Sequence, residues 1–131
     1  MRKYLILIAL VVPGLALADP AYSLKIDAPA GKKAQRGVVK IHIAPGSGYH
    51  MNKDYPTSVT VTPPTGASVE KPKQTAKDAT KFEEAGADFE VAYTSTAAGK
   101  QTFSGEIKFA VCTASTCDPK KEKLSFTVDV N

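Results

Sequence analysis

The stretch Leu124-Ser-Phe-Thr-Val-Asp-Val130 decides the fold, because every second residue in it is apolar. Successive side chains of a β-strand point to opposite faces, so this alternation gives a strand with one apolar face and one polar face. The same period of two recurs earlier in the chain, in the runs Tyr22 to Ile26, Val39 to Ile43, Val59 to Val61, Phe89 to Tyr93 and Ile107 to Val111. The sequence therefore predicts an all-β domain.

Turn-forming residues separate these runs, at Pro29 to Gly31, Pro45 to Gly48, Pro63 to Gly66, Ala85-Gly86 and Ala98-Gly99. Short strands at this spacing are typical of an antiparallel sandwich, in which two sheets pack their apolar faces together. One stretch is ambiguous. In Lys73 to Glu84 the residues Ala76, Ala79 and Phe82 could share one side of a short helix, but we expect a loop that leads into a strand.

Length and composition are those of one folded domain. The chain has 131 residues, of which 43% are apolar and 23% charged. These fractions are close to globular averages and exclude a disordered or fibrous chain. No internal repeat or second domain is visible.

The first 18 residues have the features of a secretory signal peptide. Met1-Arg2-Lys3 is positive, Tyr4 to Leu17 is apolar, and Ala16-Leu17-Ala18 offers small residues for cleavage before Asp19. The apolar run has about 14 residues, fewer than the roughly 20 of a permanent membrane helix. We therefore expect a mature domain of residues 19–131 in the bacterial periplasm, without stable membrane insertion.

Charge excludes nucleic acid as a partner. Without Arg2 and Lys3 the mature chain has 15 basic and 13 acidic side chains, a net charge of +2. Arg36 is its one arginine, and its lysines are scattered among carboxylates. Nucleic-acid surfaces instead cluster basic residues on one face.

Cys112 and Cys117 lie between two strand runs, on a hairpin-like connection of small residues. Such a loop can bring their Cα atoms to about 5.5 Å, the usual spacing for a disulfide. A six-residue closed loop stabilises a fold by only about 2 kcal/mol. A pair at a loop tip is, however, well placed for thiol–disulfide exchange, in which one thiol attacks a partner and the other resolves the mixed disulfide. Asp118 disfavours a Cys117 thiolate, whereas the lysines at 120 and 121 favour it.

Spacing alone leaves a structural disulfide, a redox pair and a metal site open. His42, His50 and Met51 are further soft ligands. A copper site would need a His and a Met soon after the ligand Cys, and neither follows Cys112. His42 is expected to face solvent, and no set of residues for hydrolytic or nucleotide chemistry stands out. We expect no metal and no organic cofactor.

Two segments resemble the amino-terminal periplasmic domain of DsbD, the bacterial thiol:disulfide interchange protein. One is Gly48-Tyr-His-Met-Asn-Lys-Asp-Tyr-Pro56, followed by the strand from Val59 to Thr62. The other is Phe103-Ser-Gly-Glu-Ile-Lys-Phe-Ala-Val-Cys-Thr-Ala-Ser-Thr-Cys-Asp-Pro119. The similarity extends loosely over most of the mature chain.

The resemblance implies an immunoglobulin-like sandwich. It also implies that the cysteine pair takes electrons from a membrane-embedded thiol reductase and passes them to thioredoxin-like periplasmic proteins. By position, Cys117 matches the family's cysteine that forms the mixed disulfide and Cys112 matches its resolving partner, while Tyr49, His50 and Asn52 match residues that line the active site. We expect a monomer.

The chain departs from the family pattern at several points. The cysteines are one residue closer together, His50 and Asn52 replace two tyrosines, and the family's cap loop falls near Lys73 to Lys77, which contains no aromatic residue. The chain ends at Asn131, so a separate electron donor is expected. The alternative is an immunoglobulin-like binding or structural domain with a permanent hairpin disulfide.

Overall fold

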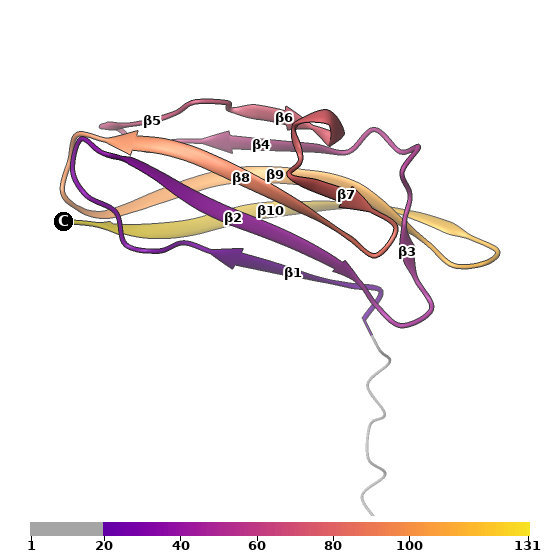
Figure 1. Ribbon diagram of the computed structural model, residues 1–131. Helices are drawn as coiled ribbons and strands as arrows, with labels where there is room; N and C mark the ends of the chain where they lie inside the picture. Colours follow the sequence, from indigo (N-terminus) through magenta and orange to yellow (C-terminus); the bar gives the residue numbers. More distant parts are fainter. Residues whose placement is uncertain (1–19) are drawn as a thin grey trace, which may run out of the picture.

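The computed structural model describes residues 20–131, so the predicted signal peptide at residues 1–18 lies outside the described part. Ten strands and one short 3-10 helix follow one another (Figure 1): β1 (Tyr22–Asp27), β2 (Arg36–Pro45), β3 (His50–Met51), β4 (Ser58–Thr62), β5 (Ala67–Val69), β6 (Lys73–Thr75), η1 (Ala76–Asp78), β7 (Lys81–Glu83), β8 (Gly86–Ser95), β9 (Gly99–Cys112) and β10 (Cys117–Val130). Every predicted run of alternating residues lies in one of these strands.

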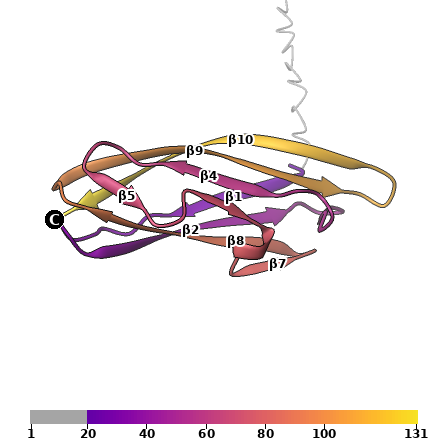
Figure 2. The same cartoon turned by 90° about the horizontal axis from the view of Figure 1, so that it is seen from above.

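The strands form two antiparallel sheets packed face to face, as the view in Figure 2 shows. One sheet has the order β1-β2-β8-β5, with β7 also paired to β8. The other has the order β10-β9-β4-β6, with β3 paired to the far end of β9. This arrangement corresponds to the strand order of immunoglobulin-like sandwiches. The predicted fold class, an immunoglobulin-like antiparallel β-sandwich, is therefore confirmed.

The alternating apolar residues meet between the sheets and form one core. In this core Phe103 of β9 is stacked on Phe126, with ring centroids 5.2 Å apart, and lies edge-on to Tyr93 at 5.3 Å. All three rings are almost fully buried. Such aromatic pairs stabilise a core beyond the effect of their buried area.

The segment from Lys73 to Glu84 differs from the predicted loop. It contains strand β6 at the edge of one sheet, the single turn η1 and strand β7 at the edge of the other, so it crosses from sheet to sheet. Its strands have three residues each and only one apolar side chain, Phe82. That is too short and too polar for an alternation to be recognised.

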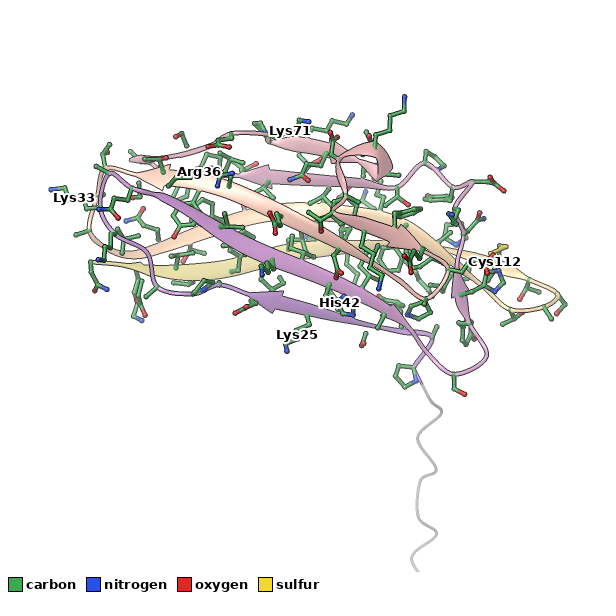
Figure 3. All side chains as sticks on the ribbon, in the orientation of Figure 1. Lys25, Lys33, Arg36, His42, Lys71 and Cys112 are labelled. Carbon is green, nitrogen blue, oxygen red and sulfur yellow. A yellow bond between two sulfur atoms is a disulfide. The ribbon has the colours of Figure 1, made fainter. Side chains whose placement is uncertain are left out.

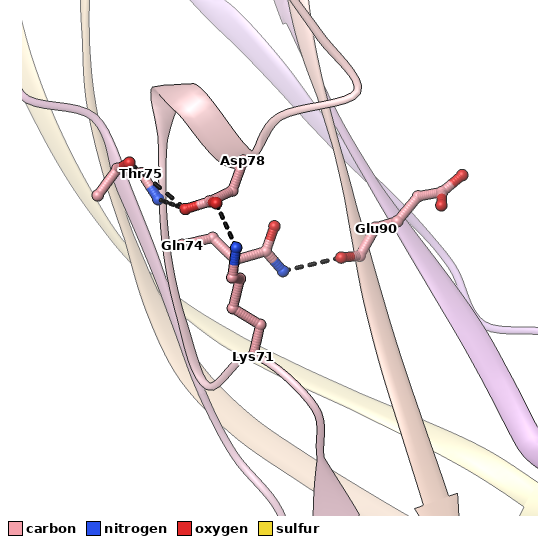
Figure 4. A network of polar contacts seen from close by, with 5 residues as sticks. All are labelled: Lys71, Gln74, Thr75, Asp78 and Glu90. Atoms are coloured by element: carbon pink, nitrogen blue, oxygen red, sulfur yellow. Dashed lines mark hydrogen bonds and ion pairs between the residues drawn. The ribbon is translucent and has the colours of Figure 1, made fainter.

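Gln74 joins the two sheets within this segment (Figure 4). On the side of β8 that faces β5 and β7, the carbonyls of three alternate residues accept hydrogen bonds. Asp88 O accepts from Thr80 N (2.9 Å), Glu90 O from Gln74 Nε2 (2.8 Å) and Ala92 O from Glu70 N (2.9 Å). The Gln74 amide thus takes the place of a main-chain donor between β7 and β5, and its side chain is buried.

Asp78 holds the turn that follows Gln74. Its carboxylate accepts hydrogen bonds from Lys71 Nζ (2.5 Å) and Thr75 N (2.9 Å). These two donors hold the pKa of Asp78 below its usual range, with Lys71 as the larger cause. The crossing segment is therefore fixed by polar contacts at its edge.

The edge strand β10 is covered over part of its length. Gly31 N donates to Asp129 O (2.8 Å), and Asn131 N donates to Gly31 O (2.9 Å), which forms a parallel bridge between Gly31 and Val130. The other half of β10 begins at Cys117 and has three lysines, at positions 120, 121 and 123. Lysines on an edge strand disfavour unspecific strand pairing.

Candidate functional site: the cysteine hairpin

The two cysteines close the hairpin of β9 and β10. These strands pair along their whole lengths, from Gly99 opposite Val130 to Cys112 opposite Cys117. Four residues, 113–116, form the tip. The hairpin-like connection predicted from the sequence is therefore present, and it extends beyond the other strands at one end of the sandwich (Figure 1).

Thr113 organises the tip. Its main-chain N donates to Thr116 O (2.7 Å), and its Oγ1 accepts hydrogen bonds from Thr116 N (3.1 Å) and Ser115 N (3.3 Å). Thr113 and Thr116 are thus a hydrogen-bonded pair of the antiparallel ladder. Hydrogen-bonded and non-hydrogen-bonded pairs alternate along such a ladder. The next pair, Cys112 and Cys117, is therefore a non-hydrogen-bonded pair.

A disulfide joins Cys112 and Cys117, with an S–S distance of 2.05 Å. Their Cα atoms are 4.0 Å apart, closer than the spacing of about 5.5 Å expected from the sequence. The reason is the register, because non-hydrogen-bonded pairs bring opposed Cα atoms to about 4.5 Å. The bond is therefore a direct link between opposed positions of two paired strands.

The two cysteines differ in exposure. Cys112 is only 3% exposed, whereas Cys117, on the edge strand, is exposed. Both side chains lie on the outer face of their sheet, because Cys112 alternates with Val111, which is in the core. Figure 3 shows Cys112 at the opposite end of the sandwich from Lys33. A molecule that approaches the disulfide from solvent therefore meets Cys117 first.

Two of the three residues predicted to line the site lie beside Cys112. The strand β3 places His50 directly opposite Cys112, on the side away from Cys117. Asn52 N donates to Ala110 O (2.9 Å), and Asn52 Oδ1 accepts from Asp54 N (3.0 Å). Both His50 and Asn52 are half-buried.

Tyr49, the third of these residues, is half-buried and packs against the hydrophobic core. The segment that the family resemblance identifies as a cap, Lys73 to Lys77, lies elsewhere. Its Thr75 pairs with Ser58, which pairs with Lys108. Lys108 precedes Cys112 by four residues, or about 13 Å along a strand.

The charges next to Cys117 pair with one another. Asp118 Oδ2 lies 2.5 Å from Lys120 Nζ. Both side chains point to the face opposite that of Cys117, because neighbouring positions of a strand alternate. Lys121 shares the outer face and lies 3.5 Å from a carboxylate oxygen of Glu106. Asp118, Lys120 and Lys121, whose effects on Cys117 the sequence left open, are thus each engaged in an ion pair.

Tyr22 is a neighbour of the hairpin that the sequence did not reveal. Its hydroxyl donates to a Glu122 carboxylate oxygen, its ring packs edge-on against Phe109 at 4.9 Å, and Lys120 Nζ lies 6.0 Å from the ring centroid. Burial, the hydrogen bond to Glu122 and nearby negative charge raise the pKa of Tyr22 to about 12. The alternation identified Tyr22 as a strand residue, but no sequence signal relates it to Glu122.

Within residues 20–131, no three His, Cys, Asp or Glu side chains gather closely enough to hold a metal ion. The second histidine, His42, is exposed on β2 of the other sheet and pairs with Asp88 of β8. The same part of the chain has no helix long and apolar enough to cross a membrane.

Comparison with known proteins gives no family. No protein-family model matches the chain, and no curated protein matches it. Among solved structures, domains 4 and 5 of the S-layer protein SbsC share 13% identity at a TM-score of 0.44, over 86% of this chain and 53% of that chain. This chain thus spans about half the length of the S-layer chain. AggA, the major subunit of aggregative adherence fimbriae type I from Escherichia coli, shares 6% identity at a TM-score of 0.43, over 92% and 100% of the two chains. At these values neither likeness bears on what the chain does.

Proposed function

We propose that this protein is a periplasmic thiol–disulfide exchange domain that relays reducing equivalents between other proteins through Cys112 and Cys117. The observation that supports the proposal best is the unequal exposure of the two cysteines. Exchange needs one sulfur that a partner can reach and a second, adjacent sulfur to resolve the mixed disulfide. Cys117 is exposed and Cys112 is 3% exposed.

The chemistry requires sulfur alone. The Cys117 thiolate attacks a partner disulfide, a new S–S bond joins Cys117 to the partner, and one partner sulfur leaves as a thiolate. The Cys112 thiolate then attacks Cys117 Sγ, which breaks the mixed disulfide and releases the second partner sulfur. The partner gains two electrons, and the domain is left with the Cys112–Cys117 disulfide.

The partners proposed are a membrane-embedded thiol reductase as electron donor and thioredoxin-like periplasmic proteins as acceptors. This assignment rests on the resemblance of the two sequence segments to the DsbD amino-terminal domain. The position of the hairpin is compatible with it, because the tip extends past the body of the sandwich and Cys117 is on an edge strand. A partner could therefore approach without displacing a neighbouring strand on that side.

The alternative is a binding or structural domain in which the disulfide is permanent. The low exposure of Cys112 favours it, because a buried sulfur is shielded from reductants. Redox potential separates the two functions. Structural disulfides have potentials below about −300 mV, whereas exchange proteins lie between about −300 and −120 mV.

The deciding experiment is a redox titration of the purified mature domain in thiol buffers, read by alkylation of free thiols and mass shift. We expect a midpoint within the exchange range. A midpoint far below about −300 mV would instead identify a structural bond.

A trapping experiment tests the separate roles of the two cysteines. In Cys112→Ala the exposed thiol has no resolving partner, so mixed disulfides with an oxidised thioredoxin-like protein should accumulate. Cys117→Ala is the matched control, because its remaining thiol is buried and should trap little. Equal trapping by both variants, or none by either, would contradict the assigned roles.

A further inference from the structure

The strand β3 has two residues, and the position opposite Cys112 is occupied by one of the two histidines of the chain. Asn52 N donates to Ala110 O, which makes Asn52 and Ala110 a hydrogen-bonded pair of the β3–β9 ladder. His50 and Cys112 lie two residues further along and belong to the same kind of pair. The side chains of directly opposed residues lie on the same face of the sheet.

Cys112 therefore has a different neighbour on each side of β9. Cys117 of β10 is covalently bound on one side, and His50 of β3 lies on the other. Opposed Cβ atoms are about 4.5–5.5 Å apart, which allows an imidazole and a thiol to meet at hydrogen-bond distance. His50 is half-buried, and Cys112 is 3% exposed, so few water molecules would compete with such a hydrogen bond.

We propose that His50 is the proton donor and acceptor for Cys112 when the disulfide opens and closes. This inference rests on the proposed function and assigns a role in it. It also explains why the buried cysteine can work as the leaving and resolving sulfur, since a thiolate held away from water needs another source of stabilisation.

The proton and electron steps balance as follows. A thiolate attacks Cys117 Sγ, a new S–S bond forms there, and the Cys112–Cys117 bond breaks with its electron pair left on Cys112 Sγ. The His50 imidazolium gives its proton to that sulfur and becomes neutral. In the reverse direction, neutral His50 takes the proton of the Cys112 thiol, and the thiolate formed attacks Cys117 Sγ of the mixed disulfide.

Charged groups around His50 come from each neighbouring element. Lys53 and Asp54 follow β3 in the chain. Glu83 ends β7, and Glu84 begins the turn to β8, where Glu84 O accepts from Met51 N (2.9 Å). On β9 and β10 the group opposite His50 is Cys112 itself. The next ionic groups on that face are Lys108, four residues before Cys112, and Lys121 opposite it, and both lysines pair with Glu106.

The experiment measures the rate of disulfide reduction by dithiothreitol from about pH 5 to 8, the range in which imidazoles titrate. Each rate is divided by the thiolate fraction of dithiothreitol. In the native protein this corrected rate should fall as pH rises, because the proton donor is lost. In His50→Gln the corrected rate should not change with pH, and at about pH 5 it should be on the order of tenfold lower than in the native protein. General acid catalysis commonly gives about 100-fold. A smaller effect is expected here because a thiolate is already a good leaving group.

His42→Gln is the matched control. It removes the other histidine, which lies on the other sheet beside Asp88, and should keep the native pH profile. A second variant, His50→Ala, leaves space for a small molecule such as imidazole. Added imidazole should therefore raise the corrected reduction rate at about pH 5 in this variant and leave that of the native protein unchanged. Circular dichroism would check that each variant is folded.

The outcomes separate this inference from the proposed function. An unchanged pH profile in His50→Gln, or no rescue of His50→Ala by imidazole, would overturn the role of His50. The exchange function would then still be supported by the redox titration and the trapping experiment. Conversely, a midpoint far below about −300 mV would overturn the exchange function even if His50 proved to assist reduction by dithiothreitol.

Discussion

At the scale of single residues, Tyr22 shows how one hydroxyl can connect two sheets. It begins β1 in one sheet, and its hydroxyl donates to Glu122 of β10 in the other. Burial, that hydrogen bond and nearby carboxylates favour the protonated phenol, which raises the pKa of Tyr22 from 10.0 to about 12. The stabilisation is therefore complete below pH 10 and is lost as pH rises through about 12.

We predict that Tyr22→Phe lowers the free energy of unfolding by about 1.5–3 kcal/mol at neutral pH, because one hydrogen bond to a charged group is removed. Its stability should also fall less than that of the native protein between pH 10 and 12. Urea denaturation at several pH values measures both effects. Burial also raises the pKa of Tyr93, but this residue is present in both proteins and cancels in the comparison.

Tyr55→Phe is the control for this prediction, since among residues 20–131 the Tyr55 hydroxyl makes no side-chain hydrogen bond to another residue. It should leave both the neutral stability and the alkaline slope unchanged. Equal stability of Tyr22→Phe and the native protein throughout this range would show that the contact with Glu122 contributes nothing.

At the scale of elements, the crossing segment from β6 to β7 depends on a side chain that imitates main chain. Gln74 Nε2 supplies the donor that Glu90 O requires between the short strands β5 and β7. Without this donor, the part-buried Glu90 O would lack the hydrogen bond that it makes with water in the unfolded chain. The Gln74 amide thus joins the two sheets at this edge.

We predict that Gln74→Met destabilises the fold by about 1–3 kcal/mol, because its volume is similar but Glu90 O is left without that donor. The control is Gln101→Met on β9, where the side chain makes no hydrogen bond to another residue of the described chain. Thermal or urea unfolding measures both variants. If the two lost equal stability, the amide of Gln74 would not be the cause.

The sequence predicts the long elements well and the short ones poorly, for a physical reason. Strands such as β2, β8 and β9 bury one face, so the runs from Val39 to Ile43 and from Phe89 to Tyr93 show the period of two. The first seven residues of β10, from Cys117 to Lys123, include no large apolar side chain, so no alternation reveals them. Register is also hidden, so nothing in the sequence places His50 opposite Cys112.

At the scale of the whole molecule, the core and not the disulfide holds the sandwich together. The buried aromatic and β-branched side chains fill the space between the sheets, and β9 pairs with β10 along their full lengths. The disulfide adds one link at the end of that ladder and closes a loop of only six residues. A domain of this size buries enough surface to fold without it.

We predict that the double variant Cys112→Ala/Cys117→Ala keeps the fold and loses at most about 2 kcal/mol of stability. Urea denaturation, compared with the disulfide-bonded native protein, measures the loss. Reduced protein and double variant should unfold at similar urea concentrations. A double variant that fails to fold would show that the bond organises more of the molecule than its position at the hairpin end indicates.

The disulfide joins the last residue pair of a long hairpin. This position limits how far a structural change caused by reduction can extend into the protein. The neighbouring residue pairs of β9 and β10 are held by side chains buried in the core, those of Phe109, Ile107 and Phe103. Breaking the disulfide therefore loosens the hairpin tip before it affects the rest of the two strands. Amide hydrogen exchange should therefore speed up on reduction within residues 110–119 and stay unchanged in the rest of the protein. A protein that distinguishes the two forms must read them at that tip, by direct contact.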